Sequence, residues 1–288
     1  MVTKDLSERK IKFHVEHNVT PNSVNTILLL FHSDDSLNSA EVYDRLSPSL
    51  WHSSKDKIKK SYLNKNLDVL NVFGILSKEA GRYRITDFGQ KLQQCLQFNQ
   101  NIYFDLMHYL YYTAWDVSKP ETYFSWTYRK ICDALWEIKP STIDKNKLAG
   151  DVYNYATTYF PEIPKIAISP YAVQGTRNWL RALNPPFVDV DGRNIRTNEG
   201  RQYCSPELFL LGIDSLYQEN EISIGTPILI DRNKEIFLAK LCLLSLNSVK
   251  NILTLTIKIF PDVLKEHSSV WGNSIILLQK LEPIDILR

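Results

Sequence analysis

The amino-acid sequence predicts a mainly α protein, with an N-terminal helical domain that contains one β hairpin and a larger C-terminal helical region with short β hairpins. Two observations support this prediction. Apolar residues recur every three or four positions along most of the chain, which is the spacing of one buried helix face. The exceptions are short stretches of alternating apolar and polar residues around turns, which are typical of β hairpins.

The length and composition are those of a globular protein with two domains, or with one domain and a substantial helical extension. Hydrophobic residues make up 44% of the 288 residues and charged residues 23%, so neither a disordered nor a fibrous chain is favoured. A formal net charge of only +2 means that any nucleic-acid contact depends on local clusters of Lys and Arg. The sequence shows neither a signal peptide nor an apolar run long enough for a membrane helix, so we expect a soluble, cytoplasmic protein without a membrane partner.

The first two helices are expected within residues 21–48. Residues 21–31 begin with a proline, which suits the first turn of a helix, and their apolar positions share one face. A second, short helix begins near Ser39 and ends before Pro48. The residues expected to face inward are Val24, Ile27, Leu28 and Phe31 in the first helix and Val42, Tyr43 and Leu46 in the second.

A longer third helix is expected to begin at Ser53 or Ser54, either of which can cap it, and to continue to Gly74. With a rotation of about 100° per residue, its apolar and polar residues separate into two arcs. The apolar arc contains Ile58, Tyr62, Leu63, Leu67, Val69, Leu70 and Phe73. The polar arc contains Lys57, Lys60, Ser61, Asn64 and Asn71.

A β hairpin follows the third helix. Two short strands, residues 75–76 and 82–85, are expected around a turn at residues 79–81, and Thr86 can cap a closing helix. Because side chains alternate along a strand, the two faces of the hairpin differ. The side chains expected to point inward are Tyr83 and Ile85, and those expected to face solvent are Lys78, Arg82 and Arg84.

The order of helix, helix, long helix, two-stranded hairpin and helix resembles that of a winged helix-turn-helix domain. The segment that supports the resemblance is YLNKNLDVLNVFGILSKEAGRYRITDFGQKL. Residues 1–98 are therefore expected to form a winged helix-turn-helix domain. Residues 99–288 are expected to form a helical domain with short β elements. Prolines near residues 161–186 indicate that this domain could be subdivided there. Residues 252–259 have the composition of a strand.

A winged helix-turn-helix domain predicts contact with double-stranded DNA through its third helix and its wing. The residue types suit this role, because Asn can pair with an adenine edge and Lys or Arg can contact phosphates or guanine. The expected DNA-binding residues are Lys55, Lys57, Lys60, Ser61, Asn64, Lys78, Arg82 and Arg84. One copy would bind weakly, so a homodimer or other subunits of a complex are expected as partners.

Three other hypotheses remain open. The winged helix could hold a partner protein, as an interaction scaffold. The aromatic residues between positions 103 and 136 could stack on single-stranded nucleic acid, although their helical spacing favours core packing. Carboxylates at Asp189, Asp191, Asp231 and Glu235 could assemble a magnesium-dependent nuclease site, although the first two are explained more simply by a hairpin turn.

The sequence motifs provide no basis for an enzyme or a cofactor. The chain has no glycine-rich phosphate loop, nucleophile elbow or HExxH motif, so we expect no catalytic residues and no cofactor. The four cysteines form no CxxC pair, so a zinc site and a disulfide framework are not expected. We expect no resident metal.

The arrangement of segments along the whole chain also resembles a poorly characterised bacterial family found beside DNA phosphorothioation and other phage-defence genes. The segments that support this resemblance are FDLMHYLYYTAWDV, YFSWTYRKICDALWE, KLAGDVYNYATTYFP and SPELFLLGIDSLYQENEISIGTPILIDRNKEIFLAKL. The resemblance implies a DNA-binding regulator, or a DNA-engaging accessory subunit of a bacterial defence or DNA-modification complex. It implies no catalytic residues.

Overall fold

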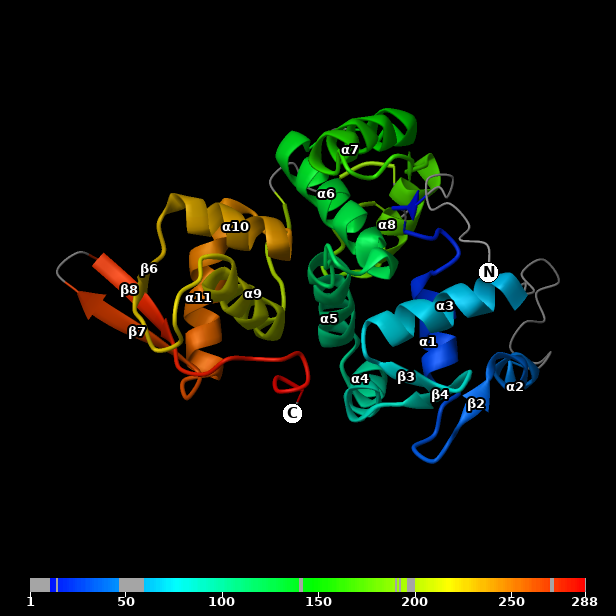
Figure 1. Cartoon of the computed structure of the whole chain (residues 1–288). Helices are drawn as coiled ribbons and strands as arrows, with labels where there is room; N and C mark the ends of the chain where they lie inside the picture. Colours follow the sequence, from blue (N-terminus) through cyan, green and yellow to red (C-terminus); the bar gives the residue numbers. More distant parts are fainter. Residues whose placement is uncertain are drawn as a thin grey trace. The chain divides into compact units, whose positions relative to one another are not determined.

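The computed structural model describes residues 11–13, 15–46, 60–139, 142–189, 191, 193–195, 200–269 and 272–287. The protein is mainly helical, with small sheets, as the sequence predicts (Figure 1). Within the described residues, none of the helices combines the length and the apolar character that crossing a bilayer requires.

The chain forms two compact units, and each unit is built from several segments. Unit 1 comprises residues 1–93, 110–134 and 143–179, and unit 2 comprises residues 94–109, 135–142 and 180–288. The expected boundary at residue 98 lies inside the first segment of unit 2, between two helices. This division differs from a cut at residue 98, because aromatic residues far along the chain complete the core of unit 1.

The N-terminal part of unit 1 has three helices and a three-stranded sheet (Figure 1). Strand β2 pairs antiparallel with β4, and β4 pairs antiparallel with β3, so the sheet order is β2-β4-β3. Helix α3 packs against α1, α2 and β3. The elements are α1 (Pro21–Leu28), β2 (Leu37–Asn38), α2 (Ser39–Arg45), α3 (Lys60–Val72), β3 (Leu76–Glu79) and β4 (Arg82–Ile85), followed by α4 (Asp87–Phe98).

Capping side chains fix where these short helices begin. Thr20 precedes α1 and forms a capping box with Ser23, and Asn38 does the same for α2 with Glu41. The Thr86 hydroxyl accepts a hydrogen bond from the Gly89 amide at 3.0 Å, which confirms it as the cap of α4. The expected start of the third helix lies outside the described residues.

Aromatic side chains from later segments form the rest of the unit 1 core. The Trp179 indole nitrogen donates to the Val19 carbonyl at 3.1 Å, and its ring lies 4.9 Å from that of Tyr111. Tyr111, Trp126 and Trp179 are at most 2% exposed, so core packing is confirmed for Tyr111 and Trp126, which belong to the aromatic residues between positions 103 and 136. The contributing elements are α5 (Gln100–Thr113), η2 (Pro120–Thr122), α6 (Tyr123–Ile138), α7 (Lys145–Tyr159) and α8 (Pro170–Ala182), with β1 (Ile11–Lys12) paired to β5 (Ile166–Ala167).

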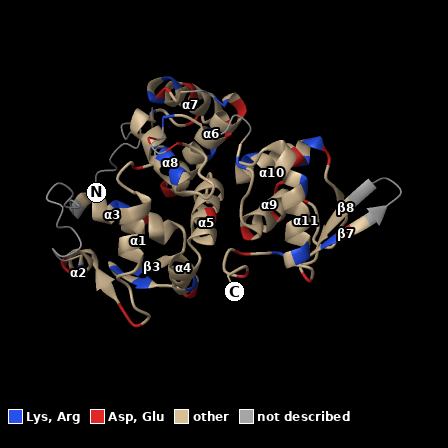
Figure 2. Cartoon of the chain, turned by 180° about the vertical axis from the view of Figure 1, so that it is seen from behind, with Lys and Arg blue, Asp and Glu red and all other residues tan. Residues whose placement is uncertain are grey.

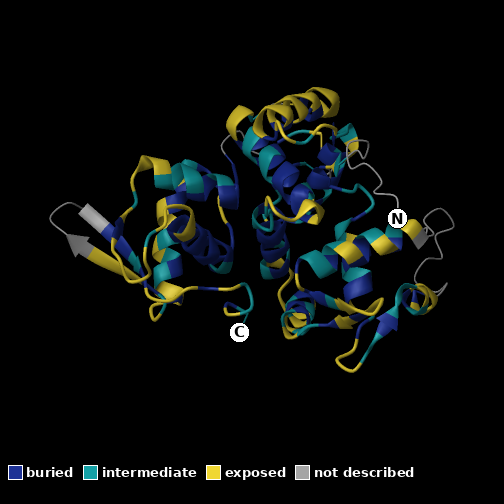
Figure 3. Ribbon diagram, in the orientation of Figure 1, coloured by how far each residue is buried: buried dark blue, intermediate teal, exposed yellow. Residues whose placement is uncertain are grey.

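Unit 2 surrounds a central, almost wholly buried helix. Helix α9 packs against both α10 and α11, and Figure 3 shows it largely in the colour of buried residues. An antiparallel sheet of order β6-β8-β7 belongs to the same unit. The elements are α9 (Pro206–Glu219), β6 (Ile228–Leu229), α10 (Arg232–Cys242), α11 (Leu246–Ile259), β7 (Leu264–Ser269) and β8 (Gly272–Leu277).

The prediction of a strand at residues 252–259 is wrong, because these residues belong to helix α11. Their alternating sequence mimics a strand, but the buried positions of the whole helix, Val249, Ile252 and Thr256, follow helical spacing. The Thr256 hydroxyl donates to the Ile252 carbonyl one turn earlier, so its polar group is satisfied within the helix.

A buried ion pair lies inside unit 2. Arg201 and Asp105 side chains are 0% and 1% exposed, and their nearest nitrogen and oxygen are 2.8 Å apart. Asp105 also accepts from the Ser205 amide at 2.7 Å, and Arg201 donates to the Asn184 carbonyl at 3.0 Å. The pair therefore joins two segments of unit 2 that are distant in sequence, residues 94–109 and residues 180–288.

Candidate nucleic-acid interface

Helix α3 has one buried face and one polar, exposed face. Leu63, Leu67 and Leu70 are fully buried, whereas Ser61 and Asn64 are exposed, as the sequence predicts. The exposed face also contains an acidic residue that was not predicted to lie there, Asp68, whose side chain is 61% exposed. Lys55 and Lys57 lie outside the described residues, as does the side chain of Lys60.

A buried asparagine fixes how α3 is rotated. The Asn66 amide group donates to the Tyr62 carbonyl at 2.8 Å, and its oxygen accepts from the Ser23 hydroxyl at 2.8 Å. Ser23 also belongs to the capping box of α1. This buried contact joins the two helices and leaves Ser61 and Asn64 facing outward. Asn66 was not predicted from the sequence, although a polar residue among the leucines of the buried face was the available signal.

The hairpin places Lys78 on the side of the sheet that faces α3. Lys78 and Tyr83 are cross-strand partners, and the Lys78 ammonium lies 4.9 Å from the centre of the Tyr83 ring. It also lies 3.8 Å from the Asp68 carboxylate of α3. Its hydrogen bond with Tyr83, and then the charge of Asp68, raise the pKa of Lys78. Lys78 is therefore a half-exposed cation next to the polar face of α3.

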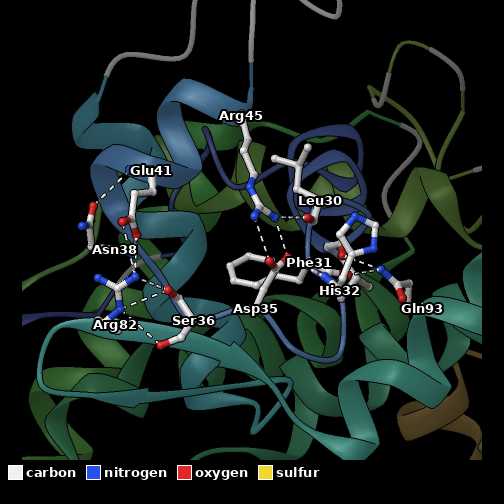
Figure 4. A network of polar contacts seen from close by, with 11 residues as sticks. Leu30, Phe31, His32, Asp35, Ser36, Asn38, Glu41, Arg45, Arg82 and Gln93 are labelled. Carbon is white, nitrogen blue, oxygen red and sulfur yellow. Dashed lines mark hydrogen bonds and ion pairs between the residues drawn. The ribbon is translucent and has the colours of Figure 1, made fainter.

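Arg82 points to the other side of the sheet and is bound within the protein (Figure 4). Its Nε donates to the Ser36 carbonyl at 3.0 Å, and its Nη2 lies 3.0 Å from the Glu41 carboxylate. The Asn38 amide and then Arg82 lower the pKa of Glu41. Arg82 thus links β4 to the capping box of α2, whereas the sequence suggested a cation directed only at solvent.

A second cluster in Figure 4 holds the loop after α1. Arg45 forms a bidentate pair with Asp35 at 2.5 and 2.8 Å, and its hydrogen bond lowers the pKa of that carboxyl. The Gln93 amide of α4 donates to the carbonyls of Leu28 and Phe31 at 2.9 and 3.0 Å. These contacts brace the helices that support α3.

Arg84 is exposed, and within the described part of the chain it has no ion-pair partner. It lies opposite Ser77 in the hairpin and, by strand alternation, on the same side as Arg82. The expected residues therefore fall into two sets. Ser61, Asn64 and Lys78 lie on the α3 side, and Arg82 and Arg84 lie on the outer side of the sheet. Figure 2 shows the positions of basic and of acidic residues interspersed along the elements of this region.

The carboxylates of the nuclease hypothesis have local structural partners. Asp189 accepts from the Arg193 amide at 2.7 Å and the Asn194 side chain at 2.6 Å, which stabilises a turn. Asp231 caps α10, and Glu235 pairs with Arg232 at 3.2 Å. Across the described ranges, no group of three or more His, Cys, Asp or Glu side chains is arranged to hold a metal ion.

The geometry thus offers a polar helix face with one adjoining lysine as the candidate contact surface. Membership of the phosphorothioation-associated family stays a prediction that rests on the order of sequence segments. No protein-family model matches the chain, and neither a curated protein nor a solved structure is significantly similar to it.

Proposed function

We propose that unit 1 contains a winged helix-turn-helix that binds double-stranded DNA with α3 in the major groove. The observation that supports this most is the element order, with helix, strand, helix, helix and hairpin, combined with the sheet order β2-β4-β3. A braced helix with an exposed polar face is what major-groove recognition requires. The protein acts in the cytoplasm as a regulator, or as the DNA-engaging subunit of a bacterial defence or DNA-modification complex.

In this proposal the two sides of the hairpin have different roles. Asn64 and Ser61 contact base edges, and Lys78 contacts a phosphate beside the groove. Arg84 adds a phosphate contact only if the duplex also reaches the outer side of the sheet. With so few cations, one copy binds weakly, so a dimer or a partner subunit supplies the remaining affinity.

Salt-titrated fluorescence anisotropy with a random duplex tests the proposal. Each lost phosphate contact lowers the slope of log Kobs against log salt by about one. We expect this decrease for Lys78→Gln, and a loss of affinity without a change of slope for Asn64→Ala. Lys265→Gln is the matched control, because Lys265 is an exposed lysine on the hairpin of unit 2. Equal slopes for the parent, Lys78→Gln and Lys265→Gln would contradict the proposal.

An interaction scaffold is the second candidate, and the charge of α3 favours it. Asp68 is exposed on the same face as Asn64, and a carboxylate there repels phosphate. Removing this charge separates the two candidates. Asp68→Asn should strengthen duplex binding if α3 enters the groove. If this face of α3 binds a partner protein instead, substitutions on the face should leave duplex binding unchanged.

A further inference from the structure

Helix α7 exposes two stacked tyrosines over a buried tryptophan of α6. The Tyr155 and Tyr159 rings are 14° from parallel, with centroids 6.3 Å apart. The Trp126 ring is 25° from Tyr155 and 36° from Tyr159, at centroid distances of 6.0 and 6.1 Å. We call these three residues the tyrosine platform. All three belong to unit 1.

The tyrosine platform combines one buried ring with two half-exposed rings. Trp126 is 2% exposed, whereas Tyr155 and Tyr159 are each 51% exposed. Leu148, Ala149, Val152 and Ala156 of α7 are buried, which fixes the rotation of the helix. Figure 3 shows the outer side of α7 in the colour of exposed residues. Neither tyrosine hydroxyl has a hydrogen-bond partner among the residues that the structure describes.

A cation lies at the edge of the tyrosine platform. The Lys130 ammonium is 4.9 Å from the centre of the Tyr155 ring and 5.9 Å from that of Trp126. Two half-exposed, nearly parallel rings suit a ligand with flat π faces, and the ammonium suits a ligand that also bears negative charge. Unpaired nucleotides combine these two properties, since each has a base that stacks and a phosphate. Peptides and neutral sugars lack this combination as a repeating feature.

We infer that the tyrosine platform binds single-stranded nucleic acid by stacking unpaired bases on Tyr155 and Tyr159, with Lys130 next to the backbone. This site is separate from the duplex contact proposed for α3 and does not depend on it. Base stacking is tolerant of sequence, because every base has a π face. The site therefore takes single strands of mixed sequence.

The test measures the affinity of the full chain for a mixed-sequence single-stranded oligonucleotide by anisotropy at low salt. Replacing both rings by apolar side chains, Tyr155→Leu with Tyr159→Leu, should weaken binding about tenfold or more. Tyr155→Phe with Tyr159→Phe keeps the rings and should retain most of the affinity. Tyr153→Leu is the control, because Tyr153 is a 41% exposed tyrosine of α7 outside the tyrosine platform.

A second measurement needs no variant. Photocrosslinking of a bromouracil-substituted single strand to the parent protein, followed by peptide mapping, should identify Tyr155 or Tyr159. Lys78→Gln should leave single-strand binding unchanged, so failure of the duplex proposal is distinguishable from failure of this one. Absent single-strand binding, equal losses in the Tyr153→Leu and double-leucine variants, or crosslinks confined to other segments would overturn the inference.

Discussion

His108 is a fully buried imidazole in unit 2. Its Nε2 lies 2.7 Å from the Leu241 carbonyl, to which the neutral ring can donate. Burial, opposed by that hydrogen bond, lowers the pKa of His108 from 6.5 to about 4. The folded protein therefore keeps the ring neutral at a pH where the unfolded chain already binds a proton.

This difference makes stability depend on pH. The unfolded chain gains the proton as pH falls through 6.5, whereas the folded protein gains it only near pH 4. The contribution of neutral His108 to the free energy of unfolding is therefore complete above pH 6.5 and decreases as pH falls toward 4. Between pH 7 and pH 5 the free energy of unfolding should fall by about 2 kcal/mol from this group. Urea titrations of the parent and His108→Gln at both pH values measure it.

The histidine control is His267, which is exposed on β7. His267→Gln should leave the decrease between the two pH values as large as in the parent. If His108→Gln retains the full decrease as well, the buried imidazole is not its source.

Single residues differ in how far the sequence reveals their roles. Tyr83 and Ile85 are buried as strand alternation predicts, being 2% and 6% exposed. The Arg82 contacts could not be predicted, because its acceptor Ser36 lies 46 residues away and is defined only by the pairing of β2 with β4. Tyr43 shows the same limit, since it was expected to face inward and is 41% exposed.

At the scale of elements, one glycine sets the distance between α4 and the hairpin. A Cβ atom at Gly89 would lie 2.2 Å from the Ile75 carbonyl oxygen and 2.8 Å from the Ile85 side chain. The Ile75 oxygen belongs to the backbone, so it cannot move away from such a Cβ atom without shifting the chain that leads into β3. Gly89 thus allows α4 to close over β3 and β4.

Gly89→Ala should therefore lower the free energy of unfolding by about 3 kcal/mol. Gly150 is the matched control, because it lies within α7 and a Cβ atom there would have nothing within 4 Å. Gly150→Ala should raise stability by about 0.5–1 kcal/mol, because alanine favours helix. Chemical denaturation of both variants gives the comparison, and equal effects of the same sign would refute the packing argument.

Elements were predictable where their signals are local. The caps of α1, α2 and α4 lie within four residues of the helices that they start, so the sequence contains all the relevant atoms. Helix α11 was misjudged, because the alternation in residues 252–259 satisfies a strand pattern and its burial against α9 is a tertiary fact. The exposed tyrosines of α7 were missed for the same reason, since exposure depends on which face is buried.

At the scale of the whole molecule, both units depend on segments that are distant in sequence. Phe13 of unit 1 is fully buried, with Tyr123 and Phe160 rings 4.5 and 5.0 Å away. Phe73 contacts the Tyr111 ring at 4.8 Å. The chain passes from one unit to the other within helices α4, α5, α6 and α8, and once more between residues 142 and 143, in the connection from α6 to α7. No single cut through the chain separates two complete cores.

Residues 1–98 alone should therefore not fold cooperatively. In that fragment Phe13, Val19 and Phe73 lose the aromatic and hydrogen-bonding partners that bury them. Circular dichroism should show a broad thermal transition for 1–98, and a sharper one for residues 1–179, which include every segment of unit 1. A sharp transition and a dispersed NMR spectrum for 1–98 would show that the N-terminal elements are self-sufficient.

The hydrogen bond from Trp179 to Val19 has a consequence for synthesis on the ribosome. It joins residues separated by 160 positions, so unit 1 cannot close until more than half of the chain has left the exit tunnel. At about 5–20 residues per second, the nascent chain spends on the order of ten seconds or more with Phe13 and Val19 exposed to chaperones. Translation rate and chaperone access should thus influence the yield of this protein more than that of one whose N-terminal domain matures first.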